Sequence, residues 1–459
     1  MITEMSESPV NWAETTHAYG PATDVPGLLK MLESDDRSER SEARWQLYGN
    51  VYHQGTRYPA SALIVPFLIR LAANPAIHER DEIIYLINGI AVGYDSLVLP
   101  KGMEPVSWRK RLEERRNLDV NEEKRQLDQW VNEAANDKKR RKRGWQRVTR
   151  LEIRKWDLKR WENAVVAYDA VRDKAVPTLC SILQDDPDYT VRAAAAHTLS
   201  HFPECVDKSM PILRSILFES SEDINPALLG STAVAFVLLY CNSEASEPDR
   251  RTVEEKLQKL LGSENSMLRC AAATGLARLE AYDIAVIREL AEATVNKSLS
   301  QSTDVWLYSG NLGQYPLLCL QDALNVSSLS ESVAGAALDP ILNGLTPETF
   351  FSNELFRIIC KLLWKTPENN PVQGSNPVPF EDLQNEREKT FFKSLAETKD
   401  FIWIRLQKDL KLWKLPRDRD SCRRYVGLPP EGPHKTAIFA IPGDSSDEGE
   451  DELPSVVMG

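Results

Sequence analysis

Side chains that could do chemistry gather in one short stretch of the chain, YGNVYHQGTRYP at residues 48–59. A His, a Gln, an Arg and three Tyr stand here around two glycines. Polar groups crowded in this way could form a ligand pocket or a reactive loop. The residues that would carry such a site are Tyr52, His53, Gln54 and Arg57.

The same stretch also fits the turn between two packed helices. SERSEARWQLYGNVY leads into it and YPASALIVPFLIRL leads out of it, and both segments have helical character. Gly55 can supply the turn, while the Tyr rings become buried and His53 caps backbone carbonyls. We favour this structural interpretation, and a ligand site at the turn is the alternative.

Other reactive groupings are sparse. His197 and His201 are spaced i, i+4, which would place two imidazoles on one helix face, but no third ligand in a known arrangement joins them. The chain contains no GxxxxGK[ST], GxGxxG, GxSxG or HExxH motif, so phosphate cradles and the common hydrolase sites are not predicted. The sequence therefore predicts no catalytic residue, no metal and no cofactor, and we expect a non-enzymatic protein.

Positive charge is concentrated in one segment of an acidic chain. The net charge is −12, yet residues 138–160 hold 12 Lys and Arg against two acids. KKRRKR at 138–143 matches nuclear-import clusters, and later arginines continue along one helical face at steps of four, three and four. The predicted basic ridge comprises Lys138, Lys139, Arg140, Arg141, Lys142, Arg143, Arg147, Arg150 and Arg154.

Two interpretations of this basic ridge remain open. The same segment carries an apolar seam at helical spacing, which predicts a docked helix with the ridge on another face. An exposed ridge could contact the phosphates of a nucleic acid. We favour a solvated helix face whose cations pair with Asp and Glu of the acidic remainder. The predicted seam consists of Trp145, Val148, Leu151, Leu158, Trp161 and Val165.

The C-terminal stretch GDSSDEGEDELPSVVMG contains six acids and no base. Its low hydrophobicity and self-repulsion predict a disordered tail. Ser445 and Ser446 precede acidic residues, as acidophilic kinases require, so they are candidate phosphorylation sites. The alternative, which we favour, is a tail that only keeps the protein in solution.

Internal repeats provide the clearest signal. The phrases DVPGLLKML, IVPFLIRLA, AVPTLCSIL and SMPILRSIL share an apolar residue, a Pro and a Leu two places after it, with prolines at 26, 66, 177 and 211. Pro is tolerated in the first turn of a helix, where we expect these four residues. A second phrase recurs 77 residues apart as TVRAAAAHTLSHF (190–202) and MLRCAAATGLARL (267–279). Paired helices every 37 to 40 residues predict an α-solenoid.

These phrases resemble HEAT repeats, chiefly over residues 12–100 and 161–280. Asp188 and Arg192 match the Asp and Arg that form a ladder between HEAT repeats, whereas Asn265 replaces the Asp before Arg269. ARWQLYGNVYHQGTRYPASALIVPFLIRLA and LWKLPRDRDSCRRYVG are similar to a widespread group of HEAT-repeat proteins without assigned activity. The resemblance implies a scaffold that binds a protein partner.

The sequence as a whole predicts an all-α fold, an α-solenoid of HEAT-type hairpins with a long charged helical insertion. The leading functional hypothesis is a non-enzymatic scaffold that binds a protein on its concave face. Alternatives are a nuclear scaffold that contacts nucleic acid through 138–160, and an enzyme or ligand-binding protein that uses the His53 turn. The expected parts are N-terminal repeats (1–103), the insertion (104–160), central repeats (161–364), a loop (365–383), a helical cap (384–427) and the tail (428–459).

Scattered cysteines and the absence of a signal peptide or a long apolar run predict a cytoplasmic protein, with the nucleus as alternative and no membrane partner. Seven Cys occur and none forms a CxxC pair, which is typical of reduced, buried thiols.

Overall fold

The computed structural model describes residues 10–94, 98–219, 224–243, 248–296, 314–326, 330–346, 352–372 and 378–432. Within these residues the fold is all-α, as predicted. The strands form only two short antiparallel hairpins, β1 (Thr16–His17) with β2 (Gly20–Pro21), and β3 (Tyr52–His53) with β4 (Thr56–Arg57). None of the described helices has both the length and the apolar composition needed to cross a membrane.

Most helices of the N-terminal and central parts pack against the next helix along the chain. The successive pairs are α1 (Val25–Met31) with α2 (Arg37–Val51), α3 (Pro59–Ala72) with α4 (Arg80–Val92), α8 (Val176–Asp185) with α9 (Tyr189–Leu199), α10 (Val206–Glu219) with α11 (Pro226–Asn242), α12 (Arg250–Leu261) with α13 (Ser266–Arg278), and α14 (Ile284–Val295) with α16 (Gln314–Leu324).

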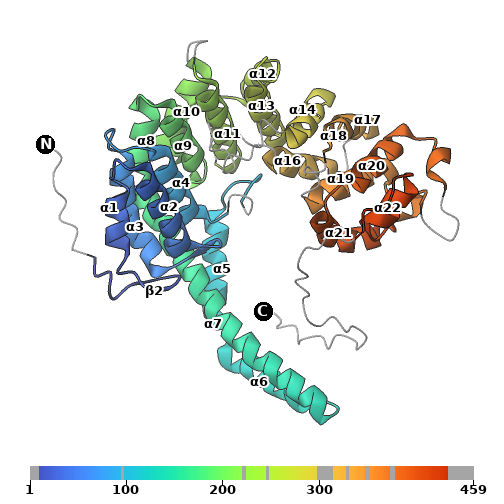
Figure 1. The fold of residues 1–459 in the computed structure, drawn as a ribbon. Coiled ribbons are helices and arrows are strands. Elements are labelled where there is room, and N and C mark those ends of the chain that lie inside the picture. Colours follow the sequence, from blue (N-terminus) through green and yellow to red (C-terminus); the bar gives the residue numbers. More distant parts are fainter. Residues whose placement is uncertain are drawn as a thin grey trace.

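The second helices of these pairs also contact one another in sequence, α4 with α9, α9 with α11, α11 with α13 and α13 with α16. Figure 1 shows α11, α13 and α16 on the inner side of an arc and α10, α12 and α14 on its outer side. Small residues allow the close approach, since a Cβ at Gly230 of α11 would lie only 3.4 Å from Ala271 of α13. One continuous hydrophobic core therefore follows the arc.

The repeated prolines occupy two kinds of position. Pro26 and Pro177 lie in the first turns of α1 and α8, as expected. Pro66 and Pro211 lie inside α3 and α10, so the first-turn prediction was wrong for these two. In α3 the helix already begins at Pro59, about two turns before Pro66, and Ser61 Oγ caps this start by accepting from the amide of Tyr58.

The charged insertion is helical and projects from the arc (Figure 1). It comprises α5 (Pro105–Asn117), α6 (Val120–Asn132) and the 38-residue α7 (Asp137–Lys174). Helix α7 runs through the expected boundary at residue 160, because its C-terminal half packs against α3, α4 and α8. Its N-terminal half pairs with α6 in the projection, which we call the projecting hairpin.

The C-terminal part consists of shorter helices. They are α17 (Glu331–Gly335), α18 (Leu338–Gly344), α19 (Asn353–Trp364), α20 (Glu386–Ala396), α21 (Asp400–Leu412) and α22 (Arg419–Tyr425). The predicted loop at 365–383 contains two short 3-10 helices, Pro367–Asn369 and Phe380–Asp382. Of the predicted tail at 428–459, only residues 428–432 are among the described residues, and Ser445 and Ser446 lie outside them.

Ion pairs link successive inter-helix turns on the N-terminal side of the arc. Arg40 of α2 donates to Glu79, which precedes α4, and Arg44 pairs with the same carboxylate. Arg80 then makes two hydrogen bonds to Asp186, between α8 and α9, at 2.5 and 2.9 Å. Burial raises the pKa of both carboxyl groups, but the arginines outweigh it and leave each pKa below its ordinary value. We call these contacts the turn ladder.

Acid should therefore weaken the fold through the turn ladder. Because the pKa values of Glu79 and Asp186 are lowered on folding, the unfolded chain binds more protons, so stability is present above pH ~4 and is lost as pH falls further. Urea denaturation at a series of pH values checks this. The double variant Glu79→Gln/Asp186→Asn should show a shallower decline, and an unchanged decline would contradict the assignment.

Candidate functional site

The YGNVYHQGTRYP stretch forms the turn between α2 and α3. Tyr52 and His53 pair with Arg57 and Thr56 across a two-residue turn made by Gln54 and Gly55. Both turn residues have positive φ, 49° and 77°, as a type I′ hairpin turn requires. Gly at the second position takes this conformation without strain. The position of this stretch between packed helices agrees with the favoured sequence interpretation.

The four candidate ligand residues do not converge. Tyr52 and Arg57 occupy one face of the small hairpin and are buried, whereas Gln54 is exposed and His53 is half-buried on the other face. The Tyr52 ring contacts Tyr48 and Tyr94, with centroids 4.6 and 5.8 Å away.

Arg57 is held in the interior of the fold. It donates to the carbonyl of Gly55 at 2.6 Å and lies over the ring of Trp108 in α5. Burial lowers the pKa of Arg57 to about 10. The residue thereby joins the turn to the insertion, which sequence reasoning did not anticipate.

His53 is accompanied by residues of the first hairpin. Its Nδ1 lies 3.2 Å from the hydroxyl of Tyr19, and the two rings meet edge to face. Nearby, His17 Nδ1 accepts from the amide of Tyr19, so its Nε2 carries the proton that it donates to Asp24 at 2.9 Å. Asn50 donates to the second oxygen of Asp24. These contacts fasten residues 16–24 to α2 and complete the hydrogen bonding of His17.

The two histidines of the hypothetical metal pair, His197 and His201, are both buried near the end of α9, with ring centroids 5.2 Å apart. Among the residues that the structure describes, no group of three or more His, Cys, Asp or Glu side chains is placed to hold a metal ion.

Four arginines of the predicted basic ridge contact α6, so the ridge does not form one exposed line. Arg147 pairs with Asp128 at 2.5 Å, and Arg154 and Arg150 pair with the buried Glu123. Arg143 lies over the ring of Trp130 and donates to its carbonyl oxygen. The favoured interpretation was that these cations pair with Asp and Glu from the acidic remainder of the chain. They do pair with carboxylates, but the acids lie on α6, the neighbouring helix of the insertion.

The remaining ridge residues, Lys138 to Lys142, are exposed in the first turns of α7. Cations at a helix N-terminus oppose the helix dipole, so this cluster weakens the end of α7 on which it stands.

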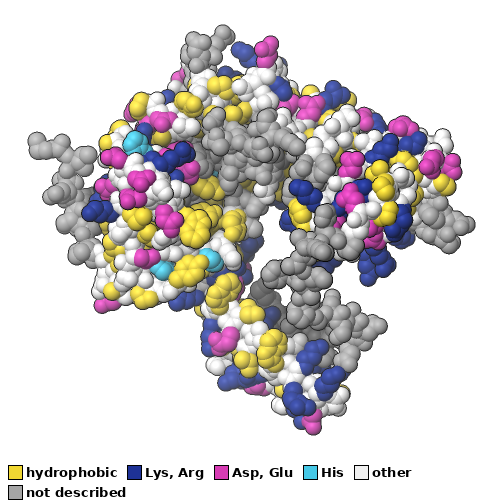
Figure 2. All heavy atoms as spheres, viewed as in Figure 1, with side chains coloured by type: hydrophobic (Ala, Val, Ile, Leu, Met, Phe, Trp, Pro, Cys, Tyr) yellow, Lys and Arg dark blue, Asp and Glu magenta, His cyan; other side chains and the backbone are white. Residues whose placement is uncertain are grey.

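The outer face of α7 carries large apolar side chains in contact with water. Trp145 and Trp156 are 71% and 55% exposed, and Val148 and Ile153 are exposed beside them. The prediction that Trp145 and Val148 belong to the docked seam was therefore wrong. The packed side of the helix bears Leu151, Leu158, Trp161 and Val165, with the inward arginines between them. Figure 2 shows hydrophobic and basic side chains intermingled on the projecting hairpin.

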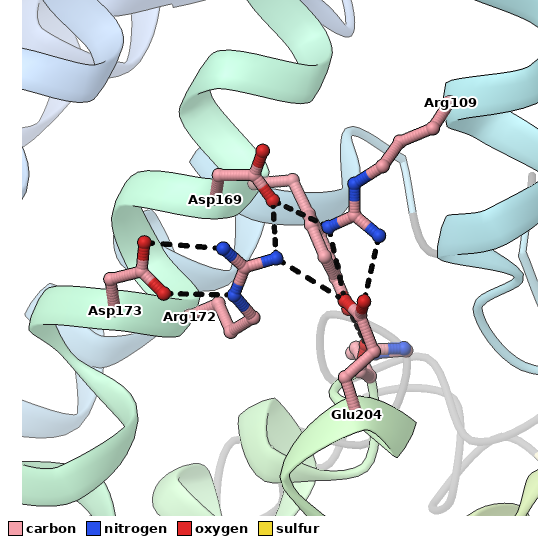
Figure 3. Close-up of polar contacts among 7 residues, drawn as sticks. Arg109, Asp169, Arg172, Asp173 and Glu204 are labelled. Carbon is pink, nitrogen blue, oxygen red and sulfur yellow. Dashed lines mark hydrogen bonds and ion pairs between the residues drawn. The ribbon is translucent and has the colours of Figure 1, made fainter.

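A network of ion pairs fixes the base of the insertion (Figure 3). Arg109 of α5 reaches Glu204 at 2.7 Å and Asp169 of α7 at 2.6 Å. Arg172 pairs with Asp169 and Asp173 and lies 3.5 Å from Glu204. Burial alone would raise the pKa of Glu204. The two arginines outweigh that effect and leave the pKa below its ordinary value, so the carboxylate stays charged. The network joins α5, α7 and the turn after α9, and its role is structural.

Residues 98–104, which precede α5, reach distant helices on the inner side of the arc (Figure 1). The carbonyl of Lys101 accepts from Asn242 of α11 at 2.7 Å and from Arg278 of α13 at 3.1 Å. Gly102 has φ +86°, and a Cβ there would lie 2.2 Å from the amide nitrogen of Asn242. We call residues 98–104 the crossing segment.

Two neighbouring cavities of about 400 and 390 Å³ flank the crossing segment. They share Pro100, Lys101 and Asp322 and therefore adjoin each other, and we call the two together the inner groove. Its apolar surface includes Trp108 and Leu318, and charged groups stand beside them. Sequence reasoning missed the inner groove because its parts lie more than 200 residues apart and share no motif.

Comparison with family models and with curated proteins finds no match for this chain. Among solved structures, a crystal structure of an engineered protein from the Northeast Structural Genomics Consortium is 14% identical, with coverage of 88% of this chain and 87% of that one and a TM-score of 0.26.

Proposed function

We propose that this chain is a HEAT-type α-solenoid scaffold that binds a segment of a protein partner in the inner groove. Support for the repeat assignment comes from a local arrangement that recurs three times. An Asp or Asn caps a helix, and an Arg four residues later donates to backbone carbonyls at the end of the preceding helix or turn. The three pairs are Asp36 with Arg40, Asp188 with Arg192, and Asn265 with Arg269.

The turn ladder gives further support. Arg40 with Glu79 and Arg80 with Asp186 connect successive turns, as the ladder of HEAT repeats does, although the residues differ from the expected Asp188 and Arg192. Asp188 is engaged in capping α9, which explains why another acid of the same turn, Asp186, accepts the arginine.

The inner groove is the best candidate for the partner surface because much of the inner side is already covered. Residues 227–239 of α11 are all buried, so the middle of the row offers little open surface. Beside it, the inner groove combines apolar side chains with Lys101, Arg111 and Asp322. Such a mixture suits a peptide that inserts apolar side chains and forms polar contacts at the rim.

The experiment is affinity purification from the native cell with nuclease, followed by mass spectrometry. The groove variant Gln321→Arg/Asp322→Arg should recover at least about tenfold less of a nuclease-resistant protein than the wild type, because reversed charge and bulk oppose docking at a central contact. The matched control, Glu33→Arg on exposed surface after α1, should retain it. A partner that is lost with nuclease, or that the groove variant keeps, would refute the proposal.

A further inference from the structure

The outer face of α7 combines exposed aromatic rings with cations along three turns of helix. Trp145 and Trp156 are 11 residues apart, which corresponds to roughly 16 Å along the helix axis. Lys142 stands one turn before the first ring, and Lys159 one turn after the second, both exposed. Arg160 lies over one face of Trp156, 5.0 Å from the ring centroid, and steadies that ring. From these contacts we propose that the outer face of α7 binds single-stranded nucleic acid.

Charged side chains and aromatic rings are mixed on the outer face of α7, and this mixture favours a nucleic acid over a lipid bilayer as its partner. A helix that lies in a membrane interface separates an apolar face from a charged one. On α7, residues 145, 152 and 156 fall on nearly one line at helical spacing, so the carboxylate of Glu152 stands between the two rings. It pairs with Lys155 at 2.9 Å, and both side chains are exposed at the surface. Insertion of this face into acyl chains would bury those charges.

The same mixture of charges and rings favours a nucleic acid over a protein as the partner. The centre of a protein interface is depleted of charged residues, whereas nucleic-acid interfaces are strongly positive. Cations on the outer face of α7 outnumber its acids, and the acid nearest the rings is already paired. Flat rings with a cation before the first and after the second fit two separated bases of one strand and the phosphates on either side of them.

A single strand fits better than a duplex for a geometric reason. The bases of a duplex are stacked on one another, and only unstacked bases can lie against aromatic side chains. The projecting hairpin also stands away from the arc, so a strand can approach it without running along the body of the protein (Figure 1). The arginines that pair with α6 take no part, because they hold the hairpin together.

The test is fluorescence anisotropy of the full-length protein with a labelled oligothymidylate or oligouridylate of about 20 nucleotides at about 50 mM salt. The wild type should bind, and Trp145→Ala/Trp156→Ala should bind at least about tenfold more weakly, because each ring lost removes a stacked base. Lys142→Gln/Lys159→Gln should also bind more weakly and reduce the salt slope by about 1.4. A duplex of the same length should bind more weakly than the single strand.

Control variants carry the same kinds of substitution elsewhere on the surface. Trp45→Ala on α2 removes an equally exposed ring, and Lys408→Gln/Lys411→Gln on α21 removes two exposed charges. Both should bind like the wild type, within about twofold, and circular dichroism should show that every variant stays folded because the altered side chains are exposed.

Three results would overturn the proposal. The first is absence of binding by the wild type at low salt, and the second is equal binding by the double Trp variant. The third is sedimentation with phosphatidylcholine–phosphatidylserine vesicles that requires the two Trp while the oligonucleotide does not bind. That result would assign the face to a membrane surface.

Discussion

Replacing Arg80 with Met is expected to lower the free energy of unfolding by about 3–5 kcal/mol. The side chains of Arg80 and Asp186 are each only 6% exposed, and the pair holds α4 against the turn between α8 and α9. Without the guanidinium, the largely buried carboxylate of Asp186 would lose its main counter-charge. Urea denaturation followed by circular dichroism at pH 7 measures the change.

Two further variants separate the loss of a buried pair from the loss of one Arg. The double variant Arg80→Met/Asp186→Asn removes both charges and should recover most of the lost stability, since the amide can still accept from the Asp188 N–H. Arg251→Met breaks an exposed i,i+4 pair with Glu255 and should leave the free energy of unfolding almost unchanged. If Arg80→Met cost no more than Arg251→Met, the turn ladder would not be a structural element.

The second large effect is expected from Gly102→Ala, which should destabilise the protein by about 2–3 kcal/mol. An alanine here would be strained at φ +86°, and its Cβ would displace the amide of Asn242. The bonds that fasten Lys101 to α11 and α13 would then be lost. Thermal unfolding measures the stability, and limited trypsin digestion should show faster cleavage after Lys101.

Gly27→Ala is the matched control, because this residue lies in the first turns of α1 and an added Cβ would meet nothing within 4 Å. It should leave stability unchanged or raise it by up to about 1 kcal/mol. Since the crossing segment forms one wall of the inner groove, Gly102→Ala should also reduce recovery of the protein partner. Unchanged stability together with unchanged cleavage would show that the segment does not depend on this glycine.

Much of the local structure could be predicted from the sequence. Caps at Asp36, Asp188 and Asn265 start α2, α9 and α13, and each is visible as an Asp or Asn before an apolar helical pattern. The turn of the YGNVYHQGTRYP stretch was also recognisable, because Gly55 stands between two such patterns. These features depend on neighbouring residues alone.

The face on which α7 packs could not be derived in this way. Trp145, Val148, Leu151 and Leu158 follow one another at helical spacing, so the sequence predicted one seam for all four and did not show which of them face the protein. Which face of α7 is packed depends on α6, because Glu123 and Asp128 of that helix attract the arginines to the packed side. The two Trp therefore remain exposed.

By itself, the sequence determined that this chain folds into capped helices with repeated spacing and an acidic surface interrupted by one basic segment. Periodicity, caps and turn residues act over only a few positions along the chain. The helices and turns that they specify could therefore be predicted from the sequence. Only the tertiary structure decided which distant groups meet. Arg80 and Asp186 are 106 residues apart, and Lys101 and Arg278 are 177 apart. Such contacts follow from the packing of whole helices, and they define both the turn ladder and the inner groove.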